Sequence, residues 1–85
     1  MKNTVTIRRL NAQDADFTAA DLSNVVFDHC DLTRAVFVSC NLNGADFRTS
    51  FGYEIDPENN YLKHAYFSVD GLYGLLKKYD IRVEN

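Results

Sequence analysis

The sequence is poor in the residues from which small catalytic and metal sites are usually built. It has no tryptophan, one proline, four scattered glycines and two cysteines. Scattered glycines exclude a phosphate-binding glycine loop, and no G-x-S-x-G spacing is present. Cys30 and Cys40, taken with His29 and His64, do not form the ligand pattern of a zinc site. We therefore expect both cysteines to be small buried core residues, without a disulfide, metal or other cofactor.

Two further absences concern membranes and secretion. The chain has no apolar run of about 18 residues, so no membrane-spanning helix is predicted. Its N-terminus lacks the apolar centre of a signal peptide, and we expect a cytoplasmic protein. At 85 residues the chain forms one compact unit, too small to bury more than roughly 60% of its unfolded surface. It therefore needs a further source of stability, such as a regular repeat, a cap or a partner.

Acidic residues are concentrated in the middle of the chain. Residues 11–60 hold nine acidic residues and two basic ones, a net charge of −7, whereas the whole chain has a net charge of −3. A surface of this sign repels the phosphates of nucleic acid. We therefore expect no direct binding to nucleic acid, and we expect any partner protein to be basic.

What the sequence does have is a repeat of five residues that keeps one phase from residue 5 to residue 47. With Ala12 as the exception, each fifth position from residue 7 is large and apolar: Ile7, Phe17, Leu22, Phe27, Leu32, Phe37, Leu42 and Phe47. An apolar residue, usually small, stands two positions before each of these, and Asp or Asn usually stands between the two. Residues two apart point to the same side of an extended chain. We expect that side to face the core, while the intervening Asp or Asn points outward and the last two residues turn a corner.

A period of five fits neither a helix nor a strand. Residues 15–19, 20–24 and 45–49 read Ala-Asp-Phe-Thr-Ala, Ala-Asp-Leu-Ser-Asn and Ala-Asp-Phe-Arg-Thr. These units resemble the A(D/N)(L/F)xx motif of the pentapeptide-repeat family, and the resemblance covers about residues 5–50 and resumes at 65–69. It implies an all-β solenoid, namely a right-handed quadrilateral β-helix with four pentapeptides per coil and, for this chain, about 2–3 coils.

Four units per coil would stack residue n on residue n+20, about 4.8 Å further along the axis. On the surface, Asp28 and Arg48 would then share an outward position, and we expect them to form an ion pair. Val26, Val36 and Val38 would also point outward. They are interpreted either as ordinary exposed apolar surface or as a contact patch for a partner.

The repeat lapses after Phe47. Residues 52–60 contain Asp-Pro and Asn-Asn turn signals, so we expect a loop at about 52–61 that bulges from the coil. Leu62 and Phe67 resume the phase and are expected in the core. The repeat domain is therefore predicted to span residues 1–69.

Residues 70–85 are predicted to form a separate C-terminal element. Leu72, Leu75, Leu76 and Tyr79 have the spacing of an amphipathic helix, and Asp70 is the expected N-cap. The end of a β-helix exposes its core and an unpaired strand edge. We therefore expect this helix to cap the C-terminal end of the solenoid.

The last residues are predicted to form a short strand at 81–83, in which Ile81 and Val83 share a side. In pentapeptide-repeat proteins a C-terminal helix often mediates dimerisation, and the resemblance implies a homodimer through residues 72–83. The N-terminal end has no comparable cap, since Val5 and Ile7 already fit the repeat. Three possibilities stay open: the first coil is exposed, a second chain covers it, or the chain is a shortened relative of longer proteins.

Two functions are compatible with this pattern, and neither is catalytic, because the repeated Asp residues are better explained as turn-forming residues than as paired catalytic acids. The first is a rigid protein–protein interaction module with an unknown partner. Its candidate contact residues are Asp16, Asp21, Asp31, Asp46, Val36 and Val38. The second follows from the resemblance: quinolone-resistance members of the family imitate DNA and bind DNA gyrase or topoisomerase IV. The acidic middle of this chain fits that function, but the predicted solenoid is short.

Overall fold

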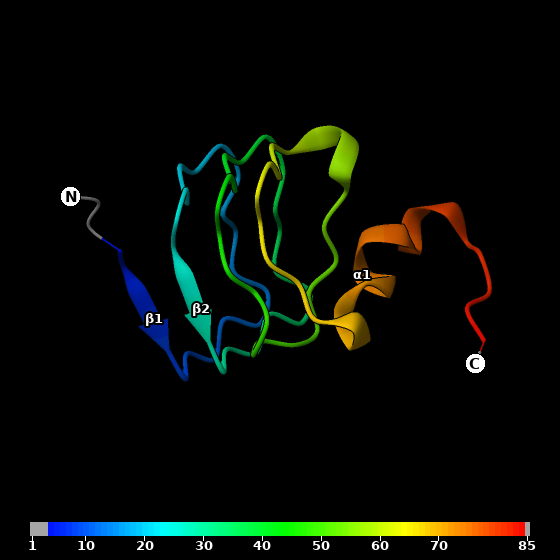
Figure 1. Cartoon of the computed structure of the whole chain (residues 1–85), viewed down its shortest axis with the longest axis horizontal. Coiled ribbons are helices and arrows are strands. Elements are labelled where there is room, and N and C mark those ends of the chain that lie inside the picture. Colours follow the sequence, from blue (N-terminus) through cyan, green and yellow to red (C-terminus); the bar gives the residue numbers. More distant parts are fainter. Residues whose placement is uncertain (1–3, 85) are drawn as a thin grey trace.

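The computed structural model describes residues 4–84; residues 1–3 and 85, at the outer ends of the two expected domains, lie outside the described residues. The chain winds into a β-helical solenoid, with its first coil at one end and a helical segment at the other (Figure 1). Strands β1 (Thr6–Arg8) and β2 (Val26–Asp28) pair in parallel. Seven isolated parallel bridges, from Asn11–Asp31 to Asp46–Tyr66, also join residues 20 apart. One turn of the solenoid therefore takes 20 residues, or four pentapeptides.

The corners of the coil are formed by residues with left-handed backbone conformation. A positive φ recurs every five positions, at Arg9, Asp14, Ala19, Asn24, His29, Arg34, Ser39 and Gly44, and again at His64. At several corners a β-turn closes around this residue; the Ala15 N–H, for example, donates to the Ala12 carbonyl at 3.1 Å. A β-turn with positive φ at its third residue is of type II. The regular return of this turn makes the sides of successive coils align.

Inward-facing phenylalanines form stacks along the solenoid. The ring centroids of Phe27 and Phe47 lie 4.9 Å apart, and those of Phe47 and Phe67 lie 5.2 Å apart. Phe17 and Phe37 form a second stack at 5.0 Å. Rings of the two stacks meet edge to face, a favoured geometry for aromatic pairs. Because these spacings are close to the distance between neighbouring strands, the ring stacks and the backbone ladder fit the same axial repeat.

Burial of the inward residues depends on their place along the solenoid. The buried members are Phe27, Leu32, Phe37, Leu42 and Phe47, in the second coil and at the start of the third. The members nearer the two ends are partly buried and pack against this core: Ile7, Phe17, Leu22, Leu62 and Phe67. The core is therefore continuous along the repeat and less well covered towards both ends.

Small polar side chains replace turn hydrogen bonds at some corners. The Ser50 hydroxyl accepts a hydrogen bond from the Cys30 N–H at 3.0 Å and donates one to the Phe27 carbonyl at 2.6 Å. On another side of the coil, the Asn60 amide oxygen accepts from the Cys40 N–H at 2.9 Å. Both cysteine thiols donate in turn to a carbonyl of the preceding coil. These side chains provide partners for backbone groups that burial would otherwise leave unsatisfied.

The predicted loop at 52–61 is wrong in its first half. Tyr53 and Ile55 point into the core and are buried, so this part of the third coil is extended. Their two-residue spacing places both side chains on the same side of an extended chain. The chain leaves the coil only at η1 (Pro57–Asn59), which begins with a proline that has no N–H for a ladder bond.

The C-terminal segment is helical, but it is not the single helix that the sequence predicts. It consists of η2 (Val69–Gly71), α1 (Tyr73–Leu76) and η3 (Lys77–Tyr79). The prediction of Asp70 as the N-cap is wrong because the first turn begins at Val69. Ser68 takes the N-cap position, and its hydroxyl accepts the Gly71 N–H at 3.2 Å.

The predicted strand at 81–83 is also absent, and residues 81–84 have no regular secondary structure. The backbone turns at Asp80, which has a φ of 52°. Beyond this turn the described chain offers Ile81 and Val83 no neighbouring strand, and an isolated strand is not stable in water.

Backbone contacts hold the helical segment against the third coil. The Ile55 N–H donates to the Gly74 carbonyl at 3.0 Å, and Leu75 packs against the buried core. A Cβ atom at Gly74 would overlap the Tyr53 carbonyl oxygen, so the close approach requires glycine.

Ion pairs tie the same segment to residues 54–58. Lys77 pairs with Glu54 at 2.5 Å, and Lys78 pairs with Asp56 at 2.9 Å and also with Glu58. Hydrogen bonding to Lys78 holds the carboxyl pKa of both Asp56 and Glu58 below the ordinary range. Groups with a lowered pKa stabilise the folded contact above their ordinary pKa, and that stabilisation is lost as the pH falls.

The first prediction concerns the buried hydroxyl of Ser50. Replacing Ser50 by Ala leaves the Cys30 N–H without a partner and the Phe27 carbonyl with only the longer bond from the Thr49 hydroxyl, at 3.4 Å. The change should lower the free energy of unfolding by about 1–3 kcal/mol. Ser50→Cys should lose less, because the Cys30 thiol makes the equivalent bond in the preceding coil. Urea denaturation of both variants tests this, and equal stability of Ser50→Ala and the wild type would contradict it.

The second prediction concerns pH. The C-terminal segment should be held most firmly above about pH 5 and loosen as the pH falls towards the lowered pKa values of Asp56 and Glu58. Lys78→Gln should weaken this pH dependence, whereas Lys63→Gln, a change on the side of the coil, should not. Hydrogen exchange of the Ile55 amide reports the contact with Gly74. An unchanged pH dependence in Lys78→Gln would show that these ion pairs do not hold the segment.

Candidate interaction surfaces

The outward aspartates are integral to the turns of the coil. Asp16 accepts hydrogen bonds from both the N–H and the hydroxyl of Thr18, and Asp21 does the same with Ser23. Asp31 repeats this arrangement with Thr33. Asp46 accepts from the N–H and the guanidinium of Arg48. These hydrogen bonds lower the pKa of all four carboxyl groups, so they stay ionised at neutral pH.

Ion pairs neutralise part of the acidic surface. Arg34 binds Asp14 in the preceding coil through two nitrogens, at 2.7 and 3.0 Å. The predicted pair between Asp28 and Arg48 is wrong. Arg48 instead binds Asp46 at 2.8 Å, because that carboxylate already caps the turn on which Arg48 lies.

Asp28 has its own partners. Its carboxylate lies 2.5 Å from His29 Nδ1 and 3.7 Å from Arg8. Within residues 4–84, by contrast, no basic side chain forms an ion pair with Asp16 or Asp21.

The six candidate contact residues do not form one surface. The bridges place Asp16 and Val36 on one side of the coil, whereas Asp21 pairs with Asn41, Asp31 with Asn11, and Asp46 with Val26 on three other sides. Val36 and Val38 are exposed, but Asp16 is the only candidate aspartate that shares their side. Five-residue spacing distributes equivalent positions around the solenoid, so a run of outward aspartates cannot gather on one face.

Aromatic residues take several outward positions beyond the second coil. Phe51 and Tyr61 of the third coil, and Tyr66 at the start of the fourth, are exposed and stack over Asp31, Asn41 and Asp46. The Arg48 guanidinium lies 4.5 Å from the centre of the Tyr66 ring. All three positions follow residue 46 at multiples of five, so the sequence does contain the signal. It is difficult to recognise because the inward residues no longer follow the repeat after Phe47.

Most of the predicted dimer residues are exposed. Leu75 is half-buried against the coil, whereas the others are exposed: Leu72, Leu76, Tyr79, Ile81 and Val83. Val69 and Tyr73 add to this surface. The exposed residues on 69–83, which we call the C-terminal apolar surface, form the densest group of exposed large apolar side chains in the described part of the chain.

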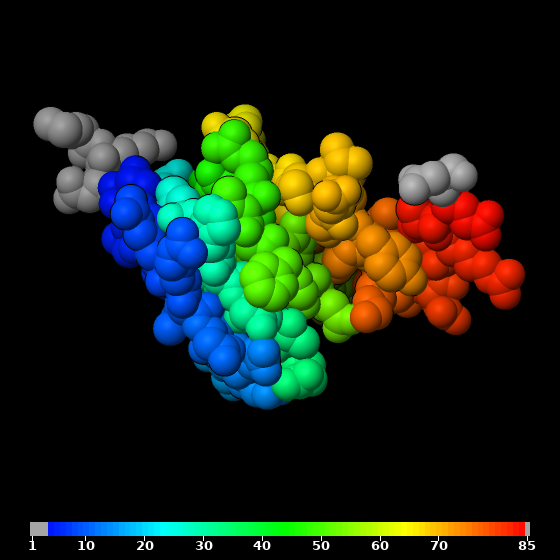
Figure 2. Space-filling model, turned by 90° about the horizontal axis from the view of Figure 1, so that it is seen from below, coloured from blue at the N-terminus to red at the C-terminus, as the bar shows by residue number. Residues whose placement is uncertain are grey.

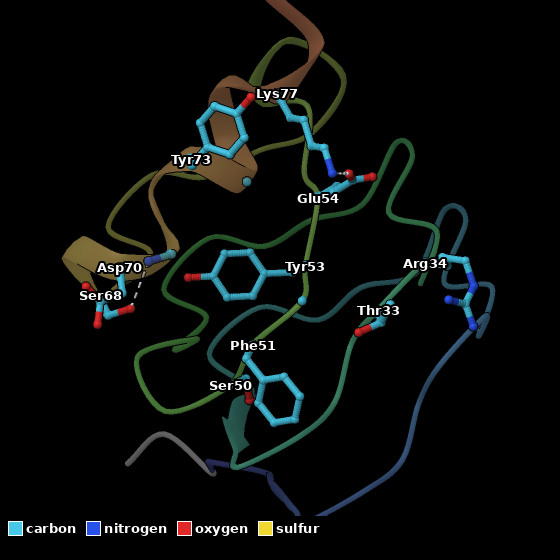
Figure 3. Close-up of a pocket in the computed structure, with 13 residues that line it drawn as sticks. Thr33, Arg34, Ser50, Phe51, Tyr53, Glu54, Ser68, Asp70, Tyr73 and Lys77 are labelled. Atoms are coloured by element: carbon cyan, nitrogen blue, oxygen red, sulfur yellow. Dashed lines mark hydrogen bonds and ion pairs between the residues drawn. The ribbon is translucent and has the colours of Figure 1, made fainter. Parts of the chain in front are cut away.

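A pocket of about 460 Å³ lies between the third coil and the helical segment (Figure 3). In the space-filling view the surface is hollowed between the coils, blue to green, and the C-terminal segment, orange to red (Figure 2). Tyr53 crosses the pocket and directs its hydroxyl towards Ser68 (Figure 3). Burial raises the pKa of this phenol, whose oxygen has no hydrogen-bond partner in the described residues. Phe51 and Tyr73 provide further aromatic walls, so the pocket suits an apolar side chain.

Cys30 and Cys40 are buried free thiols. Residues 4–84 contain no cluster of three His, Cys, Asp or Glu side chains placed to hold a metal ion. No helix in this range is long and apolar enough to cross a membrane.

Comparison with known proteins identifies the repeat. The family described as pentapeptide repeats matches residues 13–50 in eight copies. Fourteen solved chains are similar, among them a trypsin-treated variant of QnrB1, a plasmid-mediated fluoroquinolone resistance protein. That match has 18% identity and a TM-score of 0.36, and it covers 85% of this chain and 47% of the other, so this chain spans about half of that protein. No curated protein matches. Residues 13–50 of this chain therefore match the family's repeats.

Proposed function

We propose that this protein is a non-catalytic protein–protein interaction module in the cytoplasm, which forms a homodimer through residues 72–83. The observation that supports this is that exposed large apolar residues are most concentrated in the C-terminal segment, at one end of the solenoid. Large exposed apolar patches on small proteins mark sites of association. The sides of the coil are less suitable for tight binding, because their aspartates are engaged in turns and ion pairs.

In this proposal the solenoid is a right-handed quadrilateral coil and the helical segment is its cap. Leu75 covers the core, while Leu72, Leu76 and Tyr79 remain available to a second copy. The Ile81 carbonyl accepts a hydrogen bond from the Tyr73 hydroxyl at 3.2 Å. Residues 82–84 have no ladder partner in the described chain, so their backbone is also available for pairing across the dimer.

The dimer is tested by replacing Leu76, which is 38% exposed, with Lys. A charge placed in an apolar interface is buried without a partner and should weaken association at least tenfold. Val38→Lys is the matched control, since Val38 is 42% exposed on the side of the coil. Light scattering at micromolar concentration measures the mass of each protein.

The wild type and Val38→Lys should have at least twice the 9.7 kDa chain mass, and Leu76→Lys should have a smaller mass than either. A wild-type mass of one chain would reject the homodimer. A Leu76→Lys protein that associates as strongly as the wild type would place the interface elsewhere.

The second candidate function is DNA mimicry towards a basic partner such as a DNA topoisomerase. It is favoured by Asp16 and Asp21, which lie on adjacent sides of the first coil, have a lowered pKa and form no ion pair within residues 4–84. A line of fixed negative charges attracts basic clefts that otherwise receive the phosphates of DNA.

This alternative predicts that the protein inhibits supercoiling by DNA gyrase or protects the enzyme from a quinolone. The double change Asp16→Asn and Asp21→Asn removes two charges and keeps the oxygen that caps each turn, as Asn41 does. The double variant should need at least a tenfold higher protein concentration to produce the same effect on gyrase. Asp14→Asn should have little effect, because Arg34 already neutralises Asp14. If the wild-type protein has neither effect on gyrase, the mimicry proposal fails and the dimer proposal is unaffected.

A further inference from the structure

We propose that the N-terminal edge of the solenoid, formed by residues 5–22, is a second self-association surface, on which another copy of the chain docks head to head. This goes beyond the C-terminal dimer and concerns the opposite end of the molecule (Figure 1). Together the two contacts would join solenoids into a longer rod.

The backbone of the first coil presents an open strand edge. In the second coil, the Val36 N–H donates to the Ala15 carbonyl at 2.8 Å, and the Val36 carbonyl accepts from the Phe17 N–H at 2.9 Å. The middle residue of each side thus directs both backbone groups towards the preceding coil. In the first coil these residues are Thr6, Asn11, Asp16 and Asp21. Within residues 4–84, the N–H and carbonyl groups of the last three have no backbone partner.

The apolar core is open at the same end. Phe17 and Leu22 are half-buried, whereas Phe37 and Leu42, which stack on them, are buried. Leu10 is 46% exposed and Val5 is 57% exposed, although both occupy inward positions of the repeat. An open edge next to an uncovered core is the arrangement that β-proteins normally cover or pair.

The geometry of a helical coil selects one mode of docking. Since one turn rises about 4.8 Å along the axis, the end face of the first coil is not flat: side 5–7 projects furthest, and sides 10–12, 15–17 and 20–22 are each set further back. In a second copy related by a two-fold axis perpendicular to the solenoid, the sides are met in the opposite order. The gap between the two end faces is constant only when side 5–7 of each copy meets side 20–22 of the other, and side 10–12 meets side 15–17.

The strands of two coils that meet in this way run antiparallel. Opposed middle residues can then exchange both of their N–H···O hydrogen bonds, the pattern of a hydrogen-bonded antiparallel pair. Thr6 would lie opposite Asp21 of the second copy, and Asn11 opposite Asp16. In this arrangement each acidic middle residue faces a neutral one. If identical sides met instead, Asp16 would face Asp16 of the second copy and Asp21 would face Asp21.

The apolar residues match in the same arrangement. Val5 would lie opposite Leu22 of the second copy, and Leu10 opposite Phe17. The exposed apolar residues of the N-terminal edge would therefore cover the core residues that the edge leaves open. The same docking geometry therefore satisfies two independent requirements: apolar residues meet apolar residues, and acidic residues meet neutral ones.

Two charged groups near the contact are compatible with it. Arg8 lies two residues beyond Thr6 on the outward side, so it would stand diagonally from Asp21 of the second copy, an attractive pair. Asp14 lies at the corner between residues 12 and 15, where the two-fold axis passes, and each copy's Arg34 already binds its carboxylate at 2.7 Å.

The available area fits a specific but modest contact. The two shorter dimensions of the molecule are 24 and 23 Å. An end face of this size is close to the roughly 600 Å² per partner at the lower limit of standard interfaces. The association should therefore depend on concentration and be weaker than that of an obligate dimer.

Analytical ultracentrifugation of the full chain tests the proposal, with Leu76→Lys as background to remove the C-terminal contact. Leu76→Lys should still dimerise reversibly as its concentration is raised from micromolar to millimolar. Adding Leu10→Lys should weaken that dimer at least tenfold, whereas adding the similarly exposed Val38→Lys should not. A Leu76→Lys protein that stays monomeric throughout, or an unchanged dimer with Leu10→Lys, would overturn the proposal.

Hydrogen exchange provides a readout that does not depend on the substitutions. In the wild type, the Asn11 and Asp16 amides should exchange rapidly in dilute solution and at least tenfold more slowly at high concentration. The Asp31 amide, which donates to the Leu10 carbonyl, should be protected at both concentrations. Exchange of the Asn11 and Asp16 amides that does not change with concentration would contradict docking on this edge.

Discussion

Each side of the coil is hydrogen-bonded to the side 20 residues further along the chain, and every other feature of the molecule depends on this ladder. The bridges and backbone hydrogen bonds hold this offset from Thr6–Val26 to Asp46–Tyr66. It requires that four pentapeptides close one turn, and so it fixes where each corner falls. It also brings the phenylalanine rings into stacks of about the same spacing as the strands.

A ladder of this kind has two ends, and they are treated differently. At the C-terminal end, the Ile55 N–H finds the Gly74 carbonyl, and Lys77 and Lys78 hold the helical segment in place. At the N-terminal end, the described chain places nothing comparable over the first coil. Both proposed self-association contacts lie at these ends rather than on the sides, because the sides use most of their polar groups to make the turns.

The sequence predicts the solenoid well because the five-residue spacing identifies which residues point inward. Since this spacing does not shift between residues 5 and 47, successive coils can align only at offsets that keep every inward position inward. Prediction fails where a local contact decides the outcome. Arg48 can reach two carboxylates, and only the geometry of the turn selects Asp46 over Asp28. Ser68 becomes the N-cap because the first turn begins at Val69, which a residue pattern does not resolve.

The outward aromatic residues beyond the second coil show a different limitation. Phe51, Tyr61 and Tyr66 follow the outward register, but the inward residues around them depart from it, so the register is easily lost in the sequence. Tyr53 and Ile55 form only one inward pair after Phe47, and a single pair does not distinguish an extended side from a loop. Their burial depends on the C-terminal segment, which packs over them from outside the repeat.

The most direct test of the account is the offset itself, measured by nuclear Overhauser effects on isotopically labelled protein. An offset of 20 residues predicts contacts between the backbone protons of Asp16 and Val36, of Asp21 and Asn41, and of Asp46 and Tyr66. Contacts at another constant separation, or none between these pairs, would contradict it.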